Sequence, residues 1–308
     1  MERDRTASPP LGPTLLTWFL PGSGHALLGS WRTAAIGFVV VEGLYLLGFL
    51  LSGGLAFEFL DFELRGRFAL VLTPEAGNVG AVLAHLMLHP LGGPGSPPPP
   101  PGALVHVGGM LTAASGVLNI VLMAHAHLLA RLGGGGVRAA DRTARDLALG
   151  WFVPGLGHLA QGRKLRSAIS FGVVVGLFAL GTALAGGTNL TRDGGFYYWS
   201  GQFLAGLPAA VAELAAGHPV ITGFTEYHDA GVFFACLAGL LNALLLIDVY
   251  AWDESRALGR DPVADRSALA RARRDRKSSK KGAKDRPEPS AASKHLVAPV
   301  VPTSKEDV

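Results

Sequence analysis

Four long apolar stretches dominate the hydrophobic pattern of this 308-residue chain. Each is long enough to form a helix that crosses about 30 Å of hydrocarbon, which takes roughly 20 residues. The pattern therefore predicts an all-α membrane protein with four transmembrane helices. The predicted spans cover about residues 33–52, 107–129, 167–186 and 230–252.

Two shorter apolar stretches, 11–20 and 147–153, precede the first and third spans. They are too short to cross a bilayer as helices. Pro21 and Pro154 follow them, and the residue before a proline is disfavoured in a helical conformation. We expect short interfacial or re-entrant helices that end at these prolines.

The pattern occurs twice along the chain. The segment 18–29, which starts with Trp-Phe-Leu-Pro-Gly, returns 133 positions later as 151–162, and the apolar run after it keeps the same register. This self-similarity predicts tandem two-helix repeats over residues 1–134 and 147–253. Because each repeat contributes an even number of spans, both repeats are expected to insert with the same orientation.

The repeated motif has the form Pro-Gly-x-Gly-His-x-x-x-Gly. The proline ends the short helix, the first glycines permit a turn, and the last glycine offers a bare backbone on the following helix. The histidine is interpreted as a structural tie to a free backbone group or to a side chain of the other copy. Ser23 beside the histidine is Leu156 in the second copy, so we expect no nucleophile and no enzyme activity. The motif residues are Pro21, Gly22, Gly24, His25 and Gly29 in the first copy, and Pro154, Gly155, Gly157, His158 and Gly162 in the second.

This motif, together with a later span that carries Asn119 or Asn242 followed six residues on by His125 or Asp248, resembles small bacterial multi-pass membrane proteins of unknown function. Those proteins are distantly similar to the TM-two domain, whose hairpin has a Gly-x-x-Gly-x-His signature and a later acidic residue. The chain departs from that pattern because it lacks the aromatic pair after the histidine and has long outer connections. The resemblance implies an inner-membrane protein without an assigned catalytic activity or cofactor.

Composition and charge add a location and an orientation. Hydrophobic residues make up 49% of the chain and charged residues only 16%. Most Lys and Arg lie before the first span, between the second and third, or after the fourth, whereas the connections 53–106 and 187–229 are basic-poor. By the positive-inside rule, both termini are predicted to be cytoplasmic in the cell inner membrane. Amphipathic stretches near 79–89 and 204–216 would then lie at the outer leaflet.

The tail from residue 254 to 308 differs from the rest of the chain. Between residues 266 and 286 it holds ten Lys or Arg against two Asp, with almost no large apolar residues. Such a segment cannot bury enough surface to fold, so we expect a disordered cytoplasmic tail. Anionic lipid headgroups are its expected partner, and protein partners remain open. Nucleic acid is not expected, because no aromatic residues interleave with the basic ones.

Three polar residues are predicted to lie near the bilayer midplane. Glu42 lies mid-way along the first span, and an ionisable residue at that depth is a candidate functional group. Its counterpart in the second copy is Val175, so any role of Glu42 is confined to the first repeat. Asn119 and Asn242 occupy matched positions, where an asparagine typically bridges helices and fixes their register.

Histidines form a weaker set of candidates for a metal site. His85 and His89 are one helical turn apart, and two further pairs are matched between the copies. Neutral imidazole suits several transition metals, but no third ligand is fixed by spacing, so no metal is expected. The five histidines of this set are His85, His89, His106, His218 and His228.

Two function classes follow from these features. The first is a noncatalytic membrane scaffold or assembly factor, which presents a four-helix bundle and a basic tail to partners. The second is a small transporter or channel that uses the midplane carboxylate of Glu42. The scaffold is favoured, because intramembrane ionisable residues are few and no span is broken by a proline in its middle.

Overall fold

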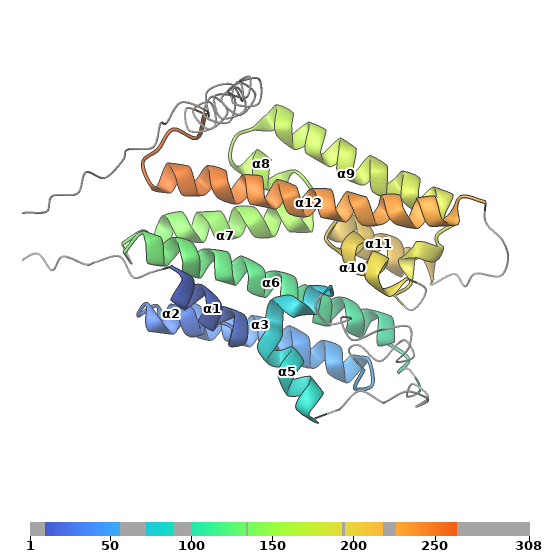
Figure 1. The fold of residues 1–308 in the computed structure, drawn as a ribbon, viewed down its shortest axis with the longest axis horizontal. Coiled ribbons are helices and arrows are strands. Elements are labelled where there is room, and N and C mark those ends of the chain that lie inside the picture. The colour runs from blue at the N-terminus through green and yellow to red at the C-terminus, as the bar shows by residue number, and fades with distance from the viewer. Residues whose placement is uncertain are drawn as a thin grey trace, which may run out of the picture. The chain divides into compact units, whose positions relative to one another are not determined.

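The structure is a computed structural model that describes residues 10–55, 72–88, 100, 102–133, 135–192, 195–217 and 226–263. Contacts between residues divide the chain into one unit over residues 1–259 and a second over 260–308. All regular elements of the described residues are helices, and they belong to the first unit (Figure 1). The basic segment 266–286 lies outside the described residues.

Four of the helices are long and apolar enough to cross a membrane, which confirms the predicted fold class. Each begins two or three residues before the predicted apolar stretch; the first and third end one or two residues before its predicted end, and the second and fourth continue beyond it into polar residues. The fourth, for example, runs on past Asp253 and Arg256. The four helices are α3 (Trp31–Leu51), α6 (Val105–Arg131), α9 (Lys164–Leu184) and α12 (His228–Ala257).

The long helices pair as two hairpins, α3 with α6 and α9 with α12 (Figure 1). In the first hairpin, a Cβ atom on Gly48 would lie 2.6 Å from the carbonyl oxygen of Gly108. In the second, a Cβ atom on Gly181 would lie 2.6 Å from the carbonyl oxygen of Gly231. Small residues that let helix backbones approach closely are typical of packing in lipid. The two hairpins therefore use the same contact at matched positions.

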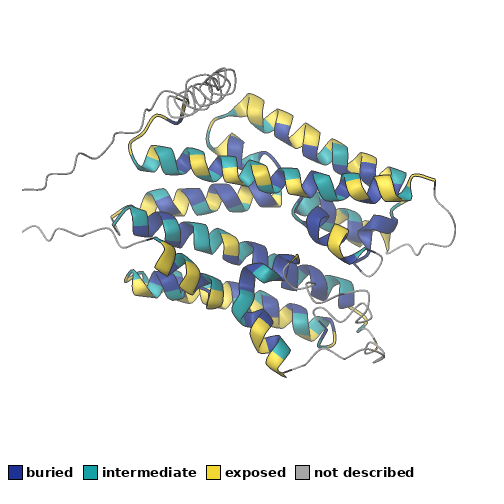
Figure 2. Cartoon of the chain, viewed as in Figure 1, coloured by how far each residue is buried: buried dark blue, intermediate teal, exposed yellow. Residues whose placement is uncertain are grey.

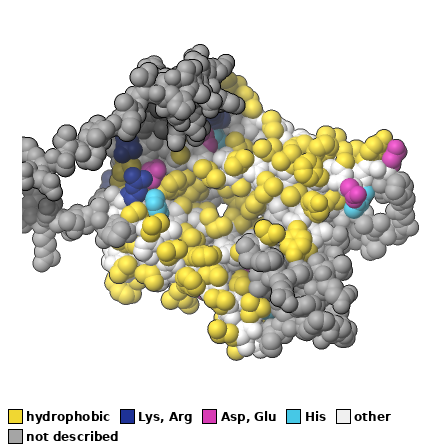
Figure 3. All heavy atoms as spheres, viewed as in Figure 1, with side chains coloured by type: hydrophobic (Ala, Val, Ile, Leu, Met, Phe, Trp, Pro, Cys, Tyr) yellow, Lys and Arg dark blue, Asp and Glu magenta, His cyan; other side chains and the backbone are white. Residues whose placement is uncertain are grey.

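The hairpins differ in how much surface they leave open. Half of the apolar stretch of α6 is buried, against 33% for the matched helix α12, whereas α3 and α9 are alike at 28% (Figure 2). Large apolar side chains such as Val39 and Leu165 are exposed, and apolar side chains cover much of the face seen in Figure 3, with charged groups toward its ends. Such a surface is stable in hydrocarbon and unfavourable in water. Together with the four long helices, it makes the chain a multi-pass membrane protein.

A short helical hairpin precedes each of the first and third long helices. It consists of α1 (Leu11–Phe19) and α2 (Ser23–Leu27) in the first half, and of α7 (Val137–Phe152) and α8 (Leu156–Ala160) in the second. Helix α7 begins ten residues before the predicted start at 147. The reason is an amphipathic extension that the apolar pattern did not reveal. It buries small or apolar side chains on one face and exposes arginines on the other; the buried residues include Ala140, Thr143, Leu147 and Gly150.

The long connections fold back onto the long helices. In the first half, a 3-10 helix η1 (Pro74–Asn78) packs against α6 and continues into α5 (Val79–Leu88). In the second half, η2 (Thr188–Leu190) is followed by α10 (Phe196–Phe203), which packs against α12, and by α11 (Leu207–Ala216). The predicted outer stretches near 79–89 and 204–216 thus correspond to α5 and α11.

Candidate functional site

The repeated motif builds the turn between the two short helices of each half. Gly22 and Gly155 have φ angles of 83° and 87°, a conformation that side chains with a Cβ atom rarely adopt. A Cβ atom on Gly22 would also lie 2.3 Å from the carbonyl oxygen of Ala34, and one on Gly155 would lie 2.5 Å from that of Ser167. Both constraints demand glycine, which explains why the motif keeps it in both copies.

The second glycine of the motif lets the short helices touch. A Cβ atom on Gly24 would lie 2.0 Å from the carbonyl oxygen of Pro13, and one on Gly157 would lie 2.5 Å from that of Asp146. The predicted role of the last glycine differs from the structure. Gly29 and Gly162 lie in the turn before the long helix, with φ angles of 78° and 80°, and a Cβ atom there would meet no atom within 4 Å in the described part of the chain.

The motif histidine of the first half contacts a second histidine, which in turn contacts a carboxylate. His25 is fully buried, and its Nε2 lies 2.7 Å from Nδ1 of His125, so one ring donates a hydrogen bond to the other. The Nε2 of His125 lies 3.0 Å from a carboxylate oxygen of Asp141 on α7. Burial, and then the His125 ring, lowers the pKa of His25 to about 4, against an opposing effect of Asp141. His25 is therefore neutral at physiological pH.

The motif histidine of the second half meets a carboxylate at the matched position. Nε2 of His158 lies 3.2 Å from Oδ2 of Asp248 on α12. The same oxygen accepts hydrogen bonds from Arg163 at 2.6 Å and from Arg166 at 2.9 Å. Burial lowers the pKa of His158, and the hydrogen bond to Asp248 opposes that shift. In both halves the partner of the motif histidine belongs to the same copy, six residues after the asparagine.

Asn119 and Asn242 each donate hydrogen bonds to the backbone of two other segments of the chain. The side-chain amide of Asn119 donates to the carbonyl oxygens of Thr17 on α1, at 3.0 Å, and of Gly77 on η1, at 2.9 Å. The amide of Asn242 donates to Gly150 on α7, at 3.3 Å, and to Leu204 after α10, at 2.9 Å. Each asparagine thus joins the end of a short helix to the returning outer connection at mid-length of a long helix.

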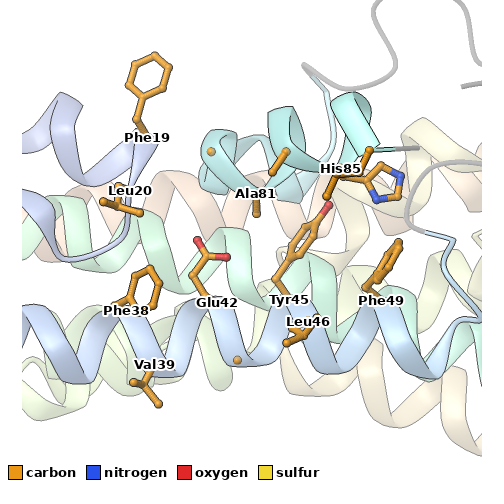
Figure 4. A pocket seen from close by; sticks show the side chains of 14 residues that line it. Phe19, Leu20, Phe38, Val39, Glu42, Tyr45, Leu46, Phe49, Ala81 and His85 are labelled. Carbon is orange, nitrogen blue, oxygen red and sulfur yellow. The ribbon is translucent and has the colours of Figure 1, made fainter. Parts of the chain in front are cut away.

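Glu42 lies in a groove of about 700 Å³ on the side of the first half. The groove runs between α3 and α5, and the carboxyl of Glu42 points from α3 toward α5 in Figure 4. Its walls include exposed apolar side chains, so it opens toward the surrounding lipid. The residues at its exposed rim are Leu20, Val39, Leu46 and Leu88.

A second polar side chain accompanies Glu42. The buried amide of Asn78 interacts with the Glu42 carboxyl, yet none of its side-chain atoms has a well-formed hydrogen bond to a described residue. Ala205 follows Leu204 in the second half as Asn78 follows Gly77 in the first, and Val175 matches Glu42. The polar pair is therefore present in the first half and replaced by apolar residues in the second, where Ala205 is part of a buried apolar cluster.

Sequence reasoning missed a buried ion pair between the two halves. Glu75 on η1 lies 2.8 Å from Arg192, and both side chains are at most 3% exposed. Thr112 also donates a hydrogen bond to Glu75, and the guanidinium of Arg192 lies 4.6 Å from the ring centroid of Trp199. Arg192 belongs to the connection 187–229, which the charge pattern places on the outer side of the membrane, and its side chain is buried. A single basic residue in an otherwise apolar connection could have indicated a buried ion pair, but no sequence pattern identifies Glu75 as its partner.

The candidate metal ligands are not brought together. His85 is buried, with its ring 5.2 Å from that of Phe49, and His228 lies 3.1 Å from Asp229. His106 lies in the first turn of α6, and His89 and His218 are outside the described residues. Within the described ranges, no group of three His, Cys, Asp or Glu side chains could hold a metal ion.

Comparison with protein families places these features in context. The model of a family of unknown function, DUF6677, matches residues 13–133 and again residues 146–262. The chain belongs to the DUF6677 family. The two matched segments start within α1 and α7 and extend past the ends of α6 and α12, so a single family unit comprises one short hairpin and one pair of long helices. A comparison with curated proteins and with solved structures finds no match.

Proposed function

We propose that this DUF6677 protein is a noncatalytic scaffold or assembly factor of the cell inner membrane. The observation that supports this function most is the groove beside Glu42. It opens toward lipid along α3, with a polar group about mid-way along the helix. A hydrogen-bonding group at this depth is within reach of another transmembrane segment, whereas the headgroup of an ordinary phospholipid lies at the membrane surface.

The other polar groups in the membrane region support a scaffold over a carrier. Asn119 and Asn242 use their amides to hold backbone carbonyls, and Glu75 is paired with Arg192. Groups that are committed to such contacts stabilise one arrangement of the helices. A carrier needs polar groups that line a path between the two halves, and Glu42 instead lines a groove at the side of the first half.

The partner we propose is a transmembrane helix with a basic or amide side chain near its middle. That side chain would donate to Glu42, and apolar residues of the helix would cover the exposed rim of the groove. Both termini of the scaffold are proposed to be cytoplasmic, because basic residues gather between the halves and after the fourth span. The basic tail would then hold anionic lipid headgroups of the inner leaflet.

Site-specific photocrosslinking in cell membranes tests the scaffold. A photoreactive residue at Leu46, in the groove, is expected to give a discrete adduct with one membrane protein. The same residue at Leu180, on the exposed face of α9, is the matched control and should give only lipid adducts. Glu42→Leu should abolish the Leu46 adduct, whereas Glu42→Gln, which keeps a hydrogen-bonding side chain, should only weaken it. Lipid adducts alone at Leu46 would reject the scaffold.

A small carrier that titrates Glu42 is the second candidate, and the closeness of Glu42 to Asn78 favours it. For a proton-coupled carrier, Glu42→Gln should abolish transport in liposomes completely, because glutamine cannot exchange the proton. For the scaffold, deletion of residues 266–286 should impair assembly of the partner complex, while a carrier should tolerate that deletion. The two candidates therefore respond to the two changes in opposite ways.

A further inference from the structure

A pocket of about 420 Å³ lies between the start of α7 and the end of α12. Three arginines contribute to its walls: Arg138 and Arg142 from α7, and Arg256 from α12. Thr143 and Asp253 supply the other polar side chains. The pocket is remote from the groove beside Glu42 in sequence, and it shares no lining residue with that groove.

Two of the three arginines, Arg138 and Arg142, are placed where positive charge is unfavourable by itself. Arg138 and Arg142 are four residues apart on one helix, so their like charges face each other. Arg138 is also in the first turn of α7, where the helix dipole disfavours a cation. Helix α7 begins at Gly136 without a side-chain cap from the described residues, which leaves backbone N–H groups available to an anion. A bound anion would relieve all three conditions at once.

Nearby carboxylates do not neutralise this charge. Asp253 is buried in the pocket and attracts Arg142 and Arg256 from a distance. Asp146, on the next turn of α7, accepts two hydrogen bonds from Arg145. Within the described ranges, none of the three pocket arginines forms a side-chain hydrogen bond or a close ion pair, so one carboxylate faces three guanidinium groups.

The second half alone carries this arrangement. The positions that match Arg138, Arg142 and Arg256 in the first half are Arg5, Pro9 and Gly133. A feature needed only for the repeated fold would be expected in both halves. Its restriction to one half indicates a ligand rather than a packing requirement.

We propose that the pocket formed by Arg138, Arg142 and Arg256 binds a phosphate group. Guanidinium groups recognise phosphate oxygens with paired, charge-assisted hydrogen bonds, and a helix N-terminus adds N–H donors of the right polarity. The phosphate is carried either by an anionic lipid headgroup or by a soluble phosphate. None of the residues that line the pocket belongs to the basic segment 266–286, and the site does not depend on which partner occupies the groove beside Glu42.

Binding to the full-length protein tests the site. The protein is placed in phosphatidylcholine nanodiscs, and thermal unfolding is followed in two series: increasing phosphatidylglycerol in the disc, and increasing inorganic phosphate at constant ionic strength. Stabilisation by phosphatidylglycerol alone identifies a lipid headgroup, and stabilisation by inorganic phosphate identifies a soluble ligand. The double variant Arg142→Gln, Arg256→Gln is expected to weaken binding of whichever ligand stabilises the protein by about ten-fold or more. This is the loss typical of a hydrogen bond to a charged group.

Two further variants separate a specific site from general charge. Lys164→Gln removes one exposed charge at the start of α9, outside the pocket, so it should change the affinity less than about two-fold. Asp253→Asn removes the competing carboxylate and should tighten phosphate binding, which a purely structural role of Asp253 does not predict. The proposal is overturned if neither ligand stabilises the protein, if Lys164→Gln weakens binding as much as the pocket variant, or if Asp253→Asn weakens it.

Discussion

The two halves of the molecule share their backbone contacts and differ in their polar chemistry. Both turn at a left-handed glycine, both close a glycine contact between long helices, and both hold two elements with one asparagine. The first half adds Glu42 and Asn78 beside a lipid-facing groove, and the second half adds an arginine pocket at the other short hairpin. The duplicated contacts maintain the fold, and functional residues are expected where the halves diverge.

The largest effect is expected at the ion pair that joins the halves. Glu75→Leu leaves the charge of Arg192 buried without a partner, so the free energy of unfolding should fall by about 3–5 kcal/mol. Thermal unfolding in detergent measures the loss. The double variant Glu75→Leu, Arg192→Leu should recover much of it, because no lone charge is then buried. Equal instability of the single and double variants would show that the pair does not act as a unit.

The glycine contact between the short helices should give similar effects in both halves. Gly24→Ala and Gly157→Ala each introduce a Cβ atom into a backbone contact, and each should cost about 1–3 kcal/mol of unfolding free energy. Gly43→Ala, where the Cβ atom meets no described atom within 4 Å, is the control and should not destabilise the protein. If only one of the two contact variants were destabilised, the halves would not share this contact.

A smaller loss is expected at the asparagines. Asn119→Ala and Asn242→Ala each remove interhelical hydrogen bonds, which contribute about 1 kcal/mol in membrane proteins. The loss should be slightly larger for Asn119, whose longer hydrogen bond is 3.0 Å against 3.3 Å for Asn242. Equilibrium unfolding of the two variants under the same detergent conditions makes the comparison. A stabilised variant at either position would contradict a structural role.

Acid should distinguish the two motif histidines, by an effect on stability that disappears at neutral pH. The pKa of His25 is about 4 in the folded chain and 6.5 as the ordinary value, so unfolding binds a proton between these pH values. Stability is complete above pH 6.5 and decreases as the pH falls toward 4. His25→Gln should therefore flatten the pH dependence of thermal unfolding. His158→Gln should flatten it less, since Asp248 opposes the shift there. The reverse order would contradict the assignment.

Much of the fold could be predicted from the sequence, because the bilayer imposes a length on apolar helices. The four spans and the glycine-rich turns follow from local patterns of this kind. The start of α7 at Val137 did not, since its buried face is made of small residues among arginines and has no long apolar run. Local pattern is therefore a better guide to lipid-facing helices than to helices that pack on protein.

The candidate sites were only partly visible for a related reason. Glu42 could be singled out because a carboxyl within an apolar span is costly. Its neighbour Asn78 could not, because it reaches α3 from a connection whose path the sequence does not give. The same holds for Glu75 and Arg192, which are 117 residues apart. Contacts of this kind depend on where distant segments of the chain pack against the long helices. A single sequence does not indicate these positions.

The separation of Glu75 and Arg192 also has a consequence for how the chain is made. A ribosome adds about 5–20 residues per second, so Glu75 is synthesised on the order of ten seconds before its cation. During that interval Glu75 lacks Arg192, the only base that pairs with it among the described residues. Expression of residues 1–134 without the second half should therefore yield a product that membrane proteases remove quickly, and co-expression of residues 135–308 should protect it.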